Sequence, residues 1–255
     1  MTKHLVIPDV QFRPGDDPGF LGHIAQYICD HKPDKVICIG DFADMPSLST
    51  YDVGKKSFEG RRYKADVEAV HTAMDILTRP IWDEVSRVRK AKKRQWNPEL
   101  YLTLGNHEDR ITRAVNDDPK LDGTIGIADL GYEKYGWKVI PYLVPIVLDG
   151  IAYSHYFSSG PMGRPIGTAN LMVNKLHMSS IAGHQQGRQV AYGRRADGIP
   201  ITCMILGSCY THEESYLGPQ GNKHFRGIAV LNEVSEGAFD EMFVSLKYLE
   251  GKYGQ

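Results

Sequence analysis

Residues 100–108 read LYLTLGNHE, an apolar run that stops at a glycine and is followed at once by polar side chains. The same arrangement recurs at residues 36–41 (VICIGD) and 180–184 (SIAGH), and at residues 5–9 (LVIPD) with proline in place of the glycine. Short apolar runs that end in this way are typical of buried parallel strands. In an open α/β sheet the loops that follow such strands meet at one edge. The pattern therefore predicts an α/β fold whose polar loop residues gather in one site.

The length and composition of the chain indicate an ordinary globular protein. Its 255 residues suffice for one large domain or two small ones with an ample core. The formal net charge of -1 gives no global bias toward nucleic acid or acidic membranes. No signal-peptide core follows Met1, and no apolar run reaches ~18 residues. The few cysteines show no Cys-x-x-Cys spacing, which argues against structural zinc and favours a reducing compartment: Cys29, Cys38, Cys203 and Cys209. We therefore predict a cytoplasmic protein that does not act in a membrane.

The first half of the chain alternates strands and helices. Apolar side chains at helical spacing over residues 20–28 lie between the strands predicted at 5–7 and 36–39, which suits a βαβ unit. A basic helical insert is predicted at about residues 55–97, and Pro80 marks a kink or break within it.

The second half consists mostly of predicted strands. Residues 144–155 resemble a hairpin that turns at Asp149-Gly150. Further strands are predicted at residues 180–182, 201–206, 227–231 and 242–246. Early strands with helices followed by further strands fit a four-layer αββα sandwich of two mixed β-sheets flanked by helices. Since no repeat or linker is evident, we predict a single domain over residues 1–255.

The loops after these strands carry donors suited to divalent cations. Asp41 follows Gly40 at a strand end, where its carboxylate can bridge two metals. One metal would be held by Asp41, Asn106, His155 and His184, and the other by Asp9, Gln11, Asp41 and Gln186. Two metals about 3.5–4 Å apart clamp a phosphoryl displacement and activate a water molecule. His107 would then protonate the leaving oxygen, and Asp44 would orient the ring of His107.

Together these motifs resemble the calcineurin-like metallophosphoesterase superfamily. Its blocks are Asp-x-His, Gly-Asp-x-x-Asp, Gly-Asn-His-Asp/Glu, a lone His on a strand and Gly-His-x-His, in that order, and the match spans about residues 5–190. The most specific matches are Gly40-Asp41-x-x-Asp44 and Gly105-Asn106-His107-Glu108. The resemblance implies a four-layer αββα fold, a binuclear metal centre and hydrolysis of phosphomonoesters or phosphodiesters. It also implies that His107 is the proton donor and that the ligands include Asp9, Asp41, Asn106, His155 and His184.

Two positions depart from the pattern of this superfamily. Gln11 stands where the first block has His, and Gln186 stands where the last block has its second His. In the superfamily both positions serve the metal that Asn106 does not bind. An amide oxygen is a harder and weaker donor than imidazole, so we expect Mn²⁺, with Mg²⁺, Zn²⁺, Fe and Ni as alternatives. A protein with one metal, or a degenerate scaffold, remains the alternative to a pair of metals.

Each candidate residue also has a structural alternative. Asp9 and Asp41 can cap helices, and Asn106 can serve as a turn residue. A lone histidine such as His155 is often only hydrogen-bonded at a strand end, and Asp44 is a common residue type at a helix start. The order of the motifs along the chain favours the functional interpretation.

The substrate is less well defined by the sequence. Arginines near the last ligand blocks would hold a phosphate through two parallel hydrogen bonds: Arg164, Arg188, Arg194 and Arg195. Basic residues near both ends of the insert would follow a nucleic-acid backbone, or would simply form a solvated helix face.

We therefore predict a metal-dependent hydrolase of phosphoester bonds, acting on DNA, RNA or a nucleotide. The alternative is a catalytically weak or inactive metal-binding interaction module of the same fold. A protein phosphatase is disfavoured, because Met45-Pro46 stands where that branch has Arg-Gly. A homo-oligomer is left open, although the charge of the insert does not favour a dry interface there.

Overall fold

A computed structural model of the chain describes residues 1–92, 95–214 and 217–254, and it contains two β-sheets. The first sheet has the order β11-β10-β1-β2-β3-β4, in which β1 to β4 are parallel and the last two strands of the chain are antiparallel. Its strands are β1 (Thr2–Ile7), β2 (Lys35–Cys38), β3 (Glu99–Thr103), β4 (Trp137–Ile140), β10 (Gly227–Ser235) and β11 (Ala238–Ser245).

The second sheet has the order β5-β6-β7-β9-β8, with three parallel strands between two antiparallel edge strands. Its strands are β5 (Ile146–Leu148), β6 (Ile151–Ser154), β7 (Ser180–Ala182), β8 (Gln189–Arg194) and β9 (Pro200–Ile205). The predicted hairpin is confirmed, since β5 and β6 pair antiparallel across Asp149-Gly150. Both sheets are mixed, as the sequence predicted.

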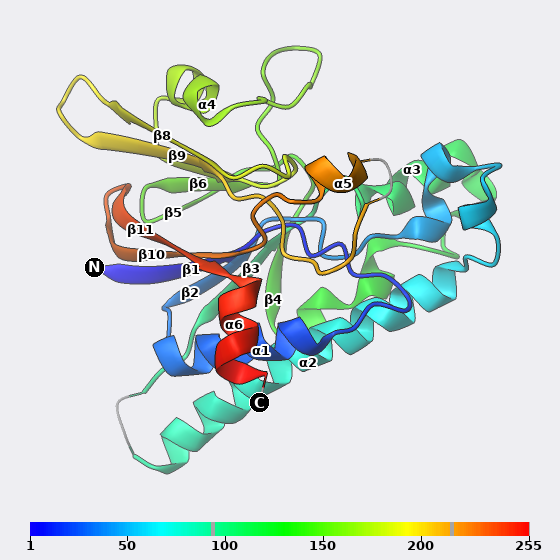
Figure 1. The fold of residues 1–255 in the computed structure, drawn as a ribbon, viewed down its shortest axis with the longest axis horizontal. Coiled ribbons are helices and arrows are strands. Elements are labelled where there is room, and N and C mark those ends of the chain that lie inside the picture. The colour runs from blue at the N-terminus through cyan, green and yellow to red at the C-terminus, as the bar shows by residue number, and fades with distance from the viewer. Residues whose placement is uncertain (93–94, 215–216, 255) are drawn as a thin grey trace.

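Helices cover the two outer faces of the pair of sheets (Figure 1). On the side of the first sheet lie α1 (Gly19–His31), α2 (Tyr63–Lys90) and α6 (Leu246–Tyr253). On the side of the second sheet lies α4 (Ala169–Leu176), which packs on β7, β8 and β9. The shorter helical segments are α3 (Asp109–Asp117), α5 (Gly218–Gly221), η1 (Pro46–Leu48), η2 (Thr50–Asp52), η3 (Lys56–Phe58), η4 (Pro119–Leu121), η5 (Ile127–Leu130) and η6 (Tyr132–Tyr135). The order helix, sheet, sheet, helix confirms the predicted four layers.

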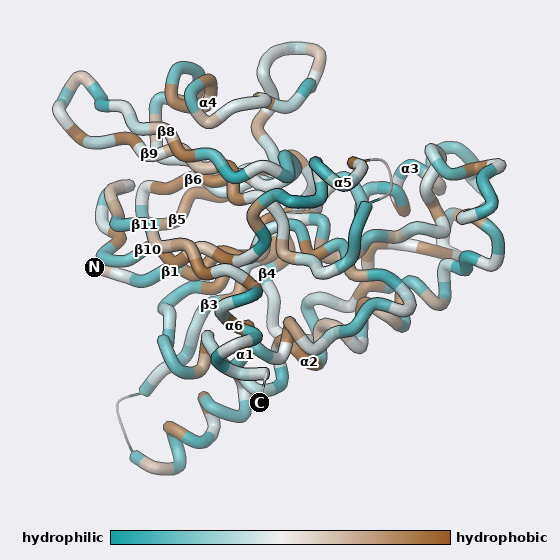
Figure 2. The backbone as a smooth tube through the Cα atoms, viewed as in Figure 1, coloured by the Kyte–Doolittle hydropathy of each residue, from teal (hydrophilic) through white to brown (hydrophobic). Residues whose placement is uncertain are grey.

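The alternation of side chains along each strand explains these layers. In β1, Leu5 and Ile7 face the helices α1 and α2, while Val6 belongs to the core between the sheets. In β9, Cys203 faces α4 and Met204 faces the first sheet. Because every second side chain points to the same face, strands that are apolar throughout are buried on both sides. Figure 2 shows the hydrophobic colour along β1, β6 and β10, and the hydrophilic colour along the loops beside α5.

Of the predicted kink or break at Pro80, the break is wrong, because α2 runs unbroken from Tyr63 to Lys90; a kink there stays a prediction. Proline supplies no backbone N–H and therefore removes one hydrogen bond of the helix. Buried side chains on both sides of it, including Leu77 and Ile81, belong to the core shared with α1. This burial holds the helix together on either side of the proline. The central part of the predicted basic insert is thus one long helix, and residues 93–94 within that prediction lie outside the described residues.

Two strands, β4 and β8, were not predicted. Both lie at the edge of a sheet, where part of the strand faces solvent. Polar residues such as Lys138 in β4 and Gln189 in β8 interrupt the apolar pattern that marks the central strands. The parallel strands β1, β2, β3, β6 and β7 all send their carboxyl ends toward one edge of the sandwich, and the candidate site lies there.

Candidate metal site

Four predicted ligands converge at the edge where the parallel strands end. Donor atoms of Asp41, His155 and His184 all lie within 4.8 Å of one another. The amide oxygen of Asn106 lies 2.8 Å from Nε2 of His155 and 2.9 Å from Nδ1 of His184. These residues follow β2, β3, β6 and β7, so both sheets contribute. We call Asp41, Asn106, His155 and His184 the donor cluster.

The hydrogen bonds of His155 favour a positive charge within this cluster. Its Nδ1 lies 3.0 Å from the carbonyl oxygen of Ile39, so this nitrogen carries a proton and donates it. The other ring nitrogen, Nε2, faces the amide oxygen of Asn106 and, at 3.3 Å, Oδ2 of Asp41. In a neutral ring Nε2 would be an acceptor facing two acceptors, an unfavourable arrangement. A cation bound by all three atoms satisfies them, so the donor set fits a divalent metal.

The pKa values of the donor cluster and of the neighbouring Asp9 are shifted by burial and by nearby charges. Burial alone would lower the pKa of His155, but the Asp41 carboxylate outweighs it and raises this pKa to about 9. Burial raises the pKa of Asp9 to about 7, against the opposing effect of His155. Burial and the neighbouring His155 lower the pKa of His184 to about 4, which leaves that ring neutral and suited to ligation. A bound divalent cation would compensate the buried carboxylates directly.

The residues predicted for a second metal lie at the border of the donor cluster. Both carboxylate oxygens of Asp9 accept the backbone N–H of His184, at 3.0 and 3.1 Å. The side chain of Gln11 is buried, and its backbone N–H donates to the carbonyl oxygen of Asp41 at 2.7 Å. Gln186 is half-buried and follows His184 by two residues. Asp9 therefore lies beside the cluster, and a second metal at these three residues stays a prediction.

The backbone of three predicted ligands is strained. Gln11, Asp41 and His184 have φ values of 44, 51 and 63°, in the left-handed region that side chains other than glycine rarely adopt. Such conformations cost on the order of 1–3 kcal/mol each and concentrate at functional sites. Three of the seven predicted metal ligands therefore have this conformation, which supports a role that depends on the direction of their side chains.

Two glycines of the motifs make room for carboxylates. A β-carbon at Gly105 would overlap Oδ1 and the amide nitrogen of Asp41, and one at Gly183 would overlap Oδ1 of Asp9. The glycine that precedes each ligand loop is therefore required by the close approach of a neighbouring carboxylate. This requirement explains why a glycine directly precedes Asn106 and another directly precedes His184.

Glu108 supports the donor cluster through hydrogen bonds to the backbone of its loops. The sequence analysis did not predict this role. Its side chain is fully buried and accepts the backbone N–H groups of Asp41 at 3.0 Å, Gly105 at 2.9 Å and Ala43 at 3.0 Å. The hydroxyl of Tyr132 donates to it as well, at 3.2 Å. The loops after β2 and β3 are thus fixed to each other by one carboxylate. In the sequence, this role of Glu108 is indicated only by its place in the Gly-Asn-His-Glu motif.

Replacing Glu108 with glutamine is expected to lower the free energy of unfolding by about 2 kcal/mol. The new amide group presents a donor to backbone donors, and each buried group left unsatisfied costs about 1–3 kcal/mol. Thermal unfolding should show a melting temperature lower by about 5 °C. Glu68→Gln, at an exposed position of α2, is the matched control and should leave the melting temperature unchanged. Equal melting temperatures for the two variants would contradict the bracing role.

His107 and Asp44 lie in contact, as predicted. Nδ1 of His107 is 2.7 Å from Oδ1 of Asp44, and the backbone N–H of His107 donates to Oδ1 of Asp41 at 2.9 Å. Arg110 anchors the pair: its Nη1 donates to the carbonyl oxygen of Asp44 at 2.6 Å, and its Nη2 lies 3.2 Å from Nε2 of His107. A guanidinium only donates, so Nε2 accepts in this conformation and Nδ1 donates to Asp44. Arg110 follows His107 by three residues, a spacing that could have indicated this contact.

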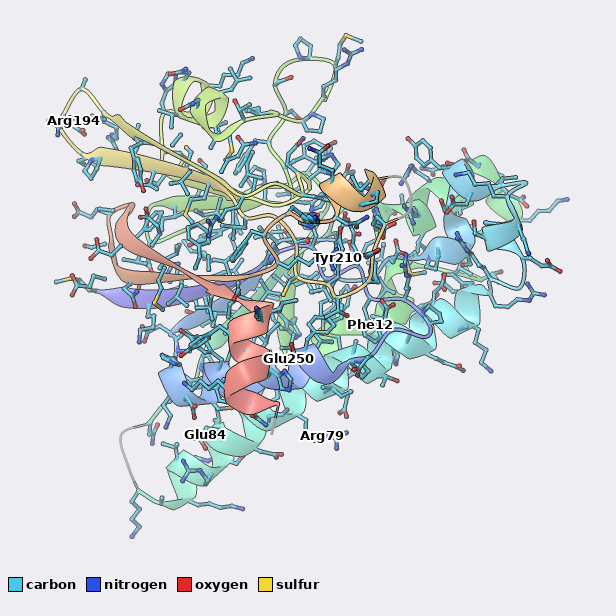
Figure 3. All side chains as sticks on the ribbon, in the orientation of Figure 1. Phe12, Arg79, Glu84, Arg194, Tyr210 and Glu250 are labelled. Carbon is cyan, nitrogen blue, oxygen red and sulfur yellow. The ribbon has the colours of Figure 1, made fainter. Side chains whose placement is uncertain are left out.

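Of the arginines predicted to bind phosphate, Arg194 lies away from the site, whereas a role for Arg164 and Arg188 stays a prediction. Arg194 lies at the far end of β8, where it pairs with Pro200, and Figure 3 shows it far from the labelled Phe12 and Tyr210, which follow β1 and β9. The guanidinium of Arg188 lies 4.5 Å from the ring centroids of both Phe225 and Phe243. Arg164 is exposed in the loop after β6. The tip of the antiparallel β8–β9 hairpin lies away from the edge that carries the ligands. The closeness of Arg194 to Gln186 in the sequence did not indicate this position.

Arg110 and Arg13 instead lie at the site. Both line a cavity of about 920 Å³ that also borders Gln11, Asn106 and His107. Nη1 of Arg13 lies 3.6 Å from Oδ2 of Asp44, and Nη1 of Arg110 lies 3.4 Å from Oδ1. Asp44 is therefore held between two guanidinium groups. Burial would raise the pKa of Asp44, but His107 and these arginines lower it overall, so its carboxylate is kept ionised.

Comparison with known proteins adds two partial sequence matches. No family model matches the chain. It is 36% identical over 84 residues to the Gene 54 protein of Mycobacterium phage D29, covering 32% of each chain. It is 42% identical over 69 residues to the Gene 54 protein of Mycobacterium phage L5, covering 27% of each chain. The matches thus span about a third or less of these relatives.

Structure comparison gives only a distant likeness. A solved crystal structure aligns over 96% of this chain and 99% of that chain, with 13% sequence identity and a TM-score of 0.36. Within the described residues, no helix combines the length and the apolar character that crossing a bilayer would require.

Proposed function

We propose that this chain is a metal-dependent phosphoester hydrolase of the calcineurin-like type. The observation that carries the proposal is the donor cluster: donor atoms of Asp41, His155 and His184 lie within 4.8 Å of one another, and the amide oxygen of Asn106 lies within 2.9 Å of both histidines. Bound divalent cations, with Mn²⁺ favoured, would supply Lewis-acid stabilisation of phosphoryl oxygens and an acidified water molecule. The adjoining cavity would hold the ester, which we propose to be a nucleotide or nucleic acid.

His107 is the residue proposed to protonate the leaving oxygen. It lies at the border between the donor cluster and the cavity, with Nε2 3.8 Å from Oδ2 of Asp41. Burial alone would lower the pKa of His107, but Asp41 and Asp44 outweigh it and raise the pKa, which favours proton uptake at Nε2 once this nitrogen no longer accepts from Arg110. Asp44 holds Nδ1, so the proton to be transferred is the one on Nε2.

Arg110 is proposed to bind the phosphoryl group of the substrate. Its Nη1 is anchored by the carbonyl oxygens of Asp44 and Met45, whereas Nη2 contacts the ring nitrogen of His107. When a phosphoryl oxygen arrives, Nη2 can transfer its hydrogen bond to that oxygen without loss of the anchor. This exchange would free Nε2 of His107 to carry the proton.

The test combines metal binding with turnover. Calorimetric titration with Mn²⁺ should show two binding events, and a single event would contradict the pair of metals. With Mn²⁺ present, the protein should hydrolyse methyl p-nitrophenyl phosphate, p-nitrophenyl phosphate, or both. Binding of Mn²⁺ without hydrolysis of either ester would instead support the metal-binding interaction module. Absence of Mn²⁺ binding would overturn both interpretations.

A further inference from the structure

The cavity of about 920 Å³ begins at the candidate catalytic residues. Gln11, Asn106 and His107 form its inner end, so it starts at the ring proposed to protonate the leaving oxygen. Its volume lies within the range of small-molecule sites, roughly 300–1,000 Å³. If the proposed function holds, this is the space that the leaving group of the ester would fill.

The outer wall of the cavity is the segment of residues 46–62 between β2 and α2, which we call the β2–α2 wall. It contains the short turns η1, η2 and η3. Asp52 accepts hydrogen bonds from Lys55 at 2.9 Å and from Arg61 at 2.8 Å, and Arg61 also donates to the carbonyl oxygen of Pro46 at 2.9 Å. Asp66 of α2 accepts the backbone N–H of Ser47 at 3.0 Å. The wall is thus cross-braced, and the cavity is formed in advance of binding.

The charges that line the cavity nearly cancel. Its basic residues are Arg13, Lys55, Arg61, Arg62 and Arg110. Its acidic residues are Asp44, Asp52, Glu59, Asp66, Glu213 and Glu214. Several of these cations are already paired within the lining, as Arg61 is with Asp52 and Arg13 is with Glu214. Grooves that follow a nucleic-acid strand carry a clear excess of positive charge, so this lining favours an uncharged polar group over a chain of phosphates.

Tyr51 provides an aromatic surface on this wall. It belongs to η2, next to the braced Asp52, and its side chain is 80% exposed. An exposed ring on a fixed turn beside a cavity is suited to stacking against a planar base. We propose that the cavity binds a single nucleoside, stacked on Tyr51, as the leaving group of a small phosphodiester, and that it does not bind a nucleic-acid strand.

Binding to the metal-free protein tests this proposal independently of hydrolysis. Titration calorimetry with thymidine 5′-monophosphate should give a dissociation constant that rises about tenfold in Tyr51→Ala and stays within twofold in Tyr51→Phe, which keeps the ring. Inorganic phosphate, which lacks the nucleoside, should bind equally to all variants. Tyr248→Ala, at an exposed tyrosine of α6, is the matched control and should behave as the unchanged protein.

A second measurement separates a single nucleoside from a strand. Thymidine 5′-monophosphate should bind at least as tightly as each site of a twenty-residue thymidine oligonucleotide, because the lining lacks the excess of positive charge that binds a strand. The proposal is overturned if Tyr51→Ala binds the mononucleotide as the unchanged protein does, or if the oligonucleotide binds much more tightly. The proposed function has a different failure, namely no hydrolysis of methyl p-nitrophenyl phosphate with Mn²⁺ bound, so the two failures are distinguishable.

Discussion

Replacing His107 with alanine is expected to lower kcat for phosphodiester hydrolysis by about 10²–10⁴-fold, the usual contribution of a general acid. The ring is fixed by Asp44 at 2.7 Å and stands between the donor cluster and the cavity, where a leaving oxygen would lie. The side chain of His107 is not a member of the donor cluster, so the substitution should leave the Mn²⁺ content of the protein unchanged. Steady-state kinetics with methyl p-nitrophenyl phosphate and metal analysis of the same preparation measure the two quantities together.

Two outcomes of the His107→Ala experiment would count against the proposed role. A kcat within about threefold of that of the unchanged protein would mean that the leaving oxygen needs no proton from this ring. A matching loss of Mn²⁺ would show that His107 supports the site rather than the chemistry. His23→Ala, on α1 behind the first sheet, is the matched control and should change neither quantity.

The convergence of the ligands could be predicted because each one directly follows an apolar run. Buried central strands produce such runs, and their carboxyl ends meet at one edge for geometric reasons. The order of Asp41, Asn106, His155 and His184 along the chain therefore carried enough information to place them together. The two mixed sheets were predicted from the order of the elements, in which early strands with helices are followed mostly by further strands.

The surroundings of the cluster could not be predicted in this way. Arg110 and Glu108 act through contacts with backbone groups of other loops, and no pattern in the sequence encodes which backbone group a side chain will reach. Arg194 follows Gln186 closely in sequence, yet the hairpin of β8 and β9 carries it to the opposite end of the sheet. The edge strands β4 and β8 lack the continuous apolar character on which strand prediction depends.

The β2–α2 wall shows a related difference between sequence and structure. Basic residues near the start of the predicted insert suggested a surface for nucleic acid, but within the wall Lys55 and Arg61 are bound to Asp52. Charge counted along the sequence does not reveal which cations are already neutralised by a neighbour. This pairing supports the proposal of a small ester over a strand.

Replacing Gly105 with alanine is expected to damage both the fold and the metal site. The added methyl group would overlap Oδ1 and the backbone nitrogen of Asp41, and the overlap cannot be relieved by rotation of a flexible side chain because backbone is involved. Overpacking costs about 1–3 kcal/mol, and loss of the Asp41 N–H bond to Glu108 adds about 1–3 kcal/mol. We expect a free energy of unfolding lower by about 4 kcal/mol and a melting temperature lower by about 10 °C.

The same substitution should weaken Mn²⁺ binding at least tenfold, since displaced support of a ligand typically costs about 10–100-fold in metal affinity. Gly167→Ala is the matched control, because a β-carbon at Gly167 has nothing within 4 Å and its backbone is not left-handed. Calorimetric titration of both variants at a temperature where each is folded separates affinity from stability. If Gly105→Ala bound Mn²⁺ as tightly as Gly167→Ala, the carboxylate of Asp41 would not be the ligand that this close approach implies, and the donor cluster would need another explanation.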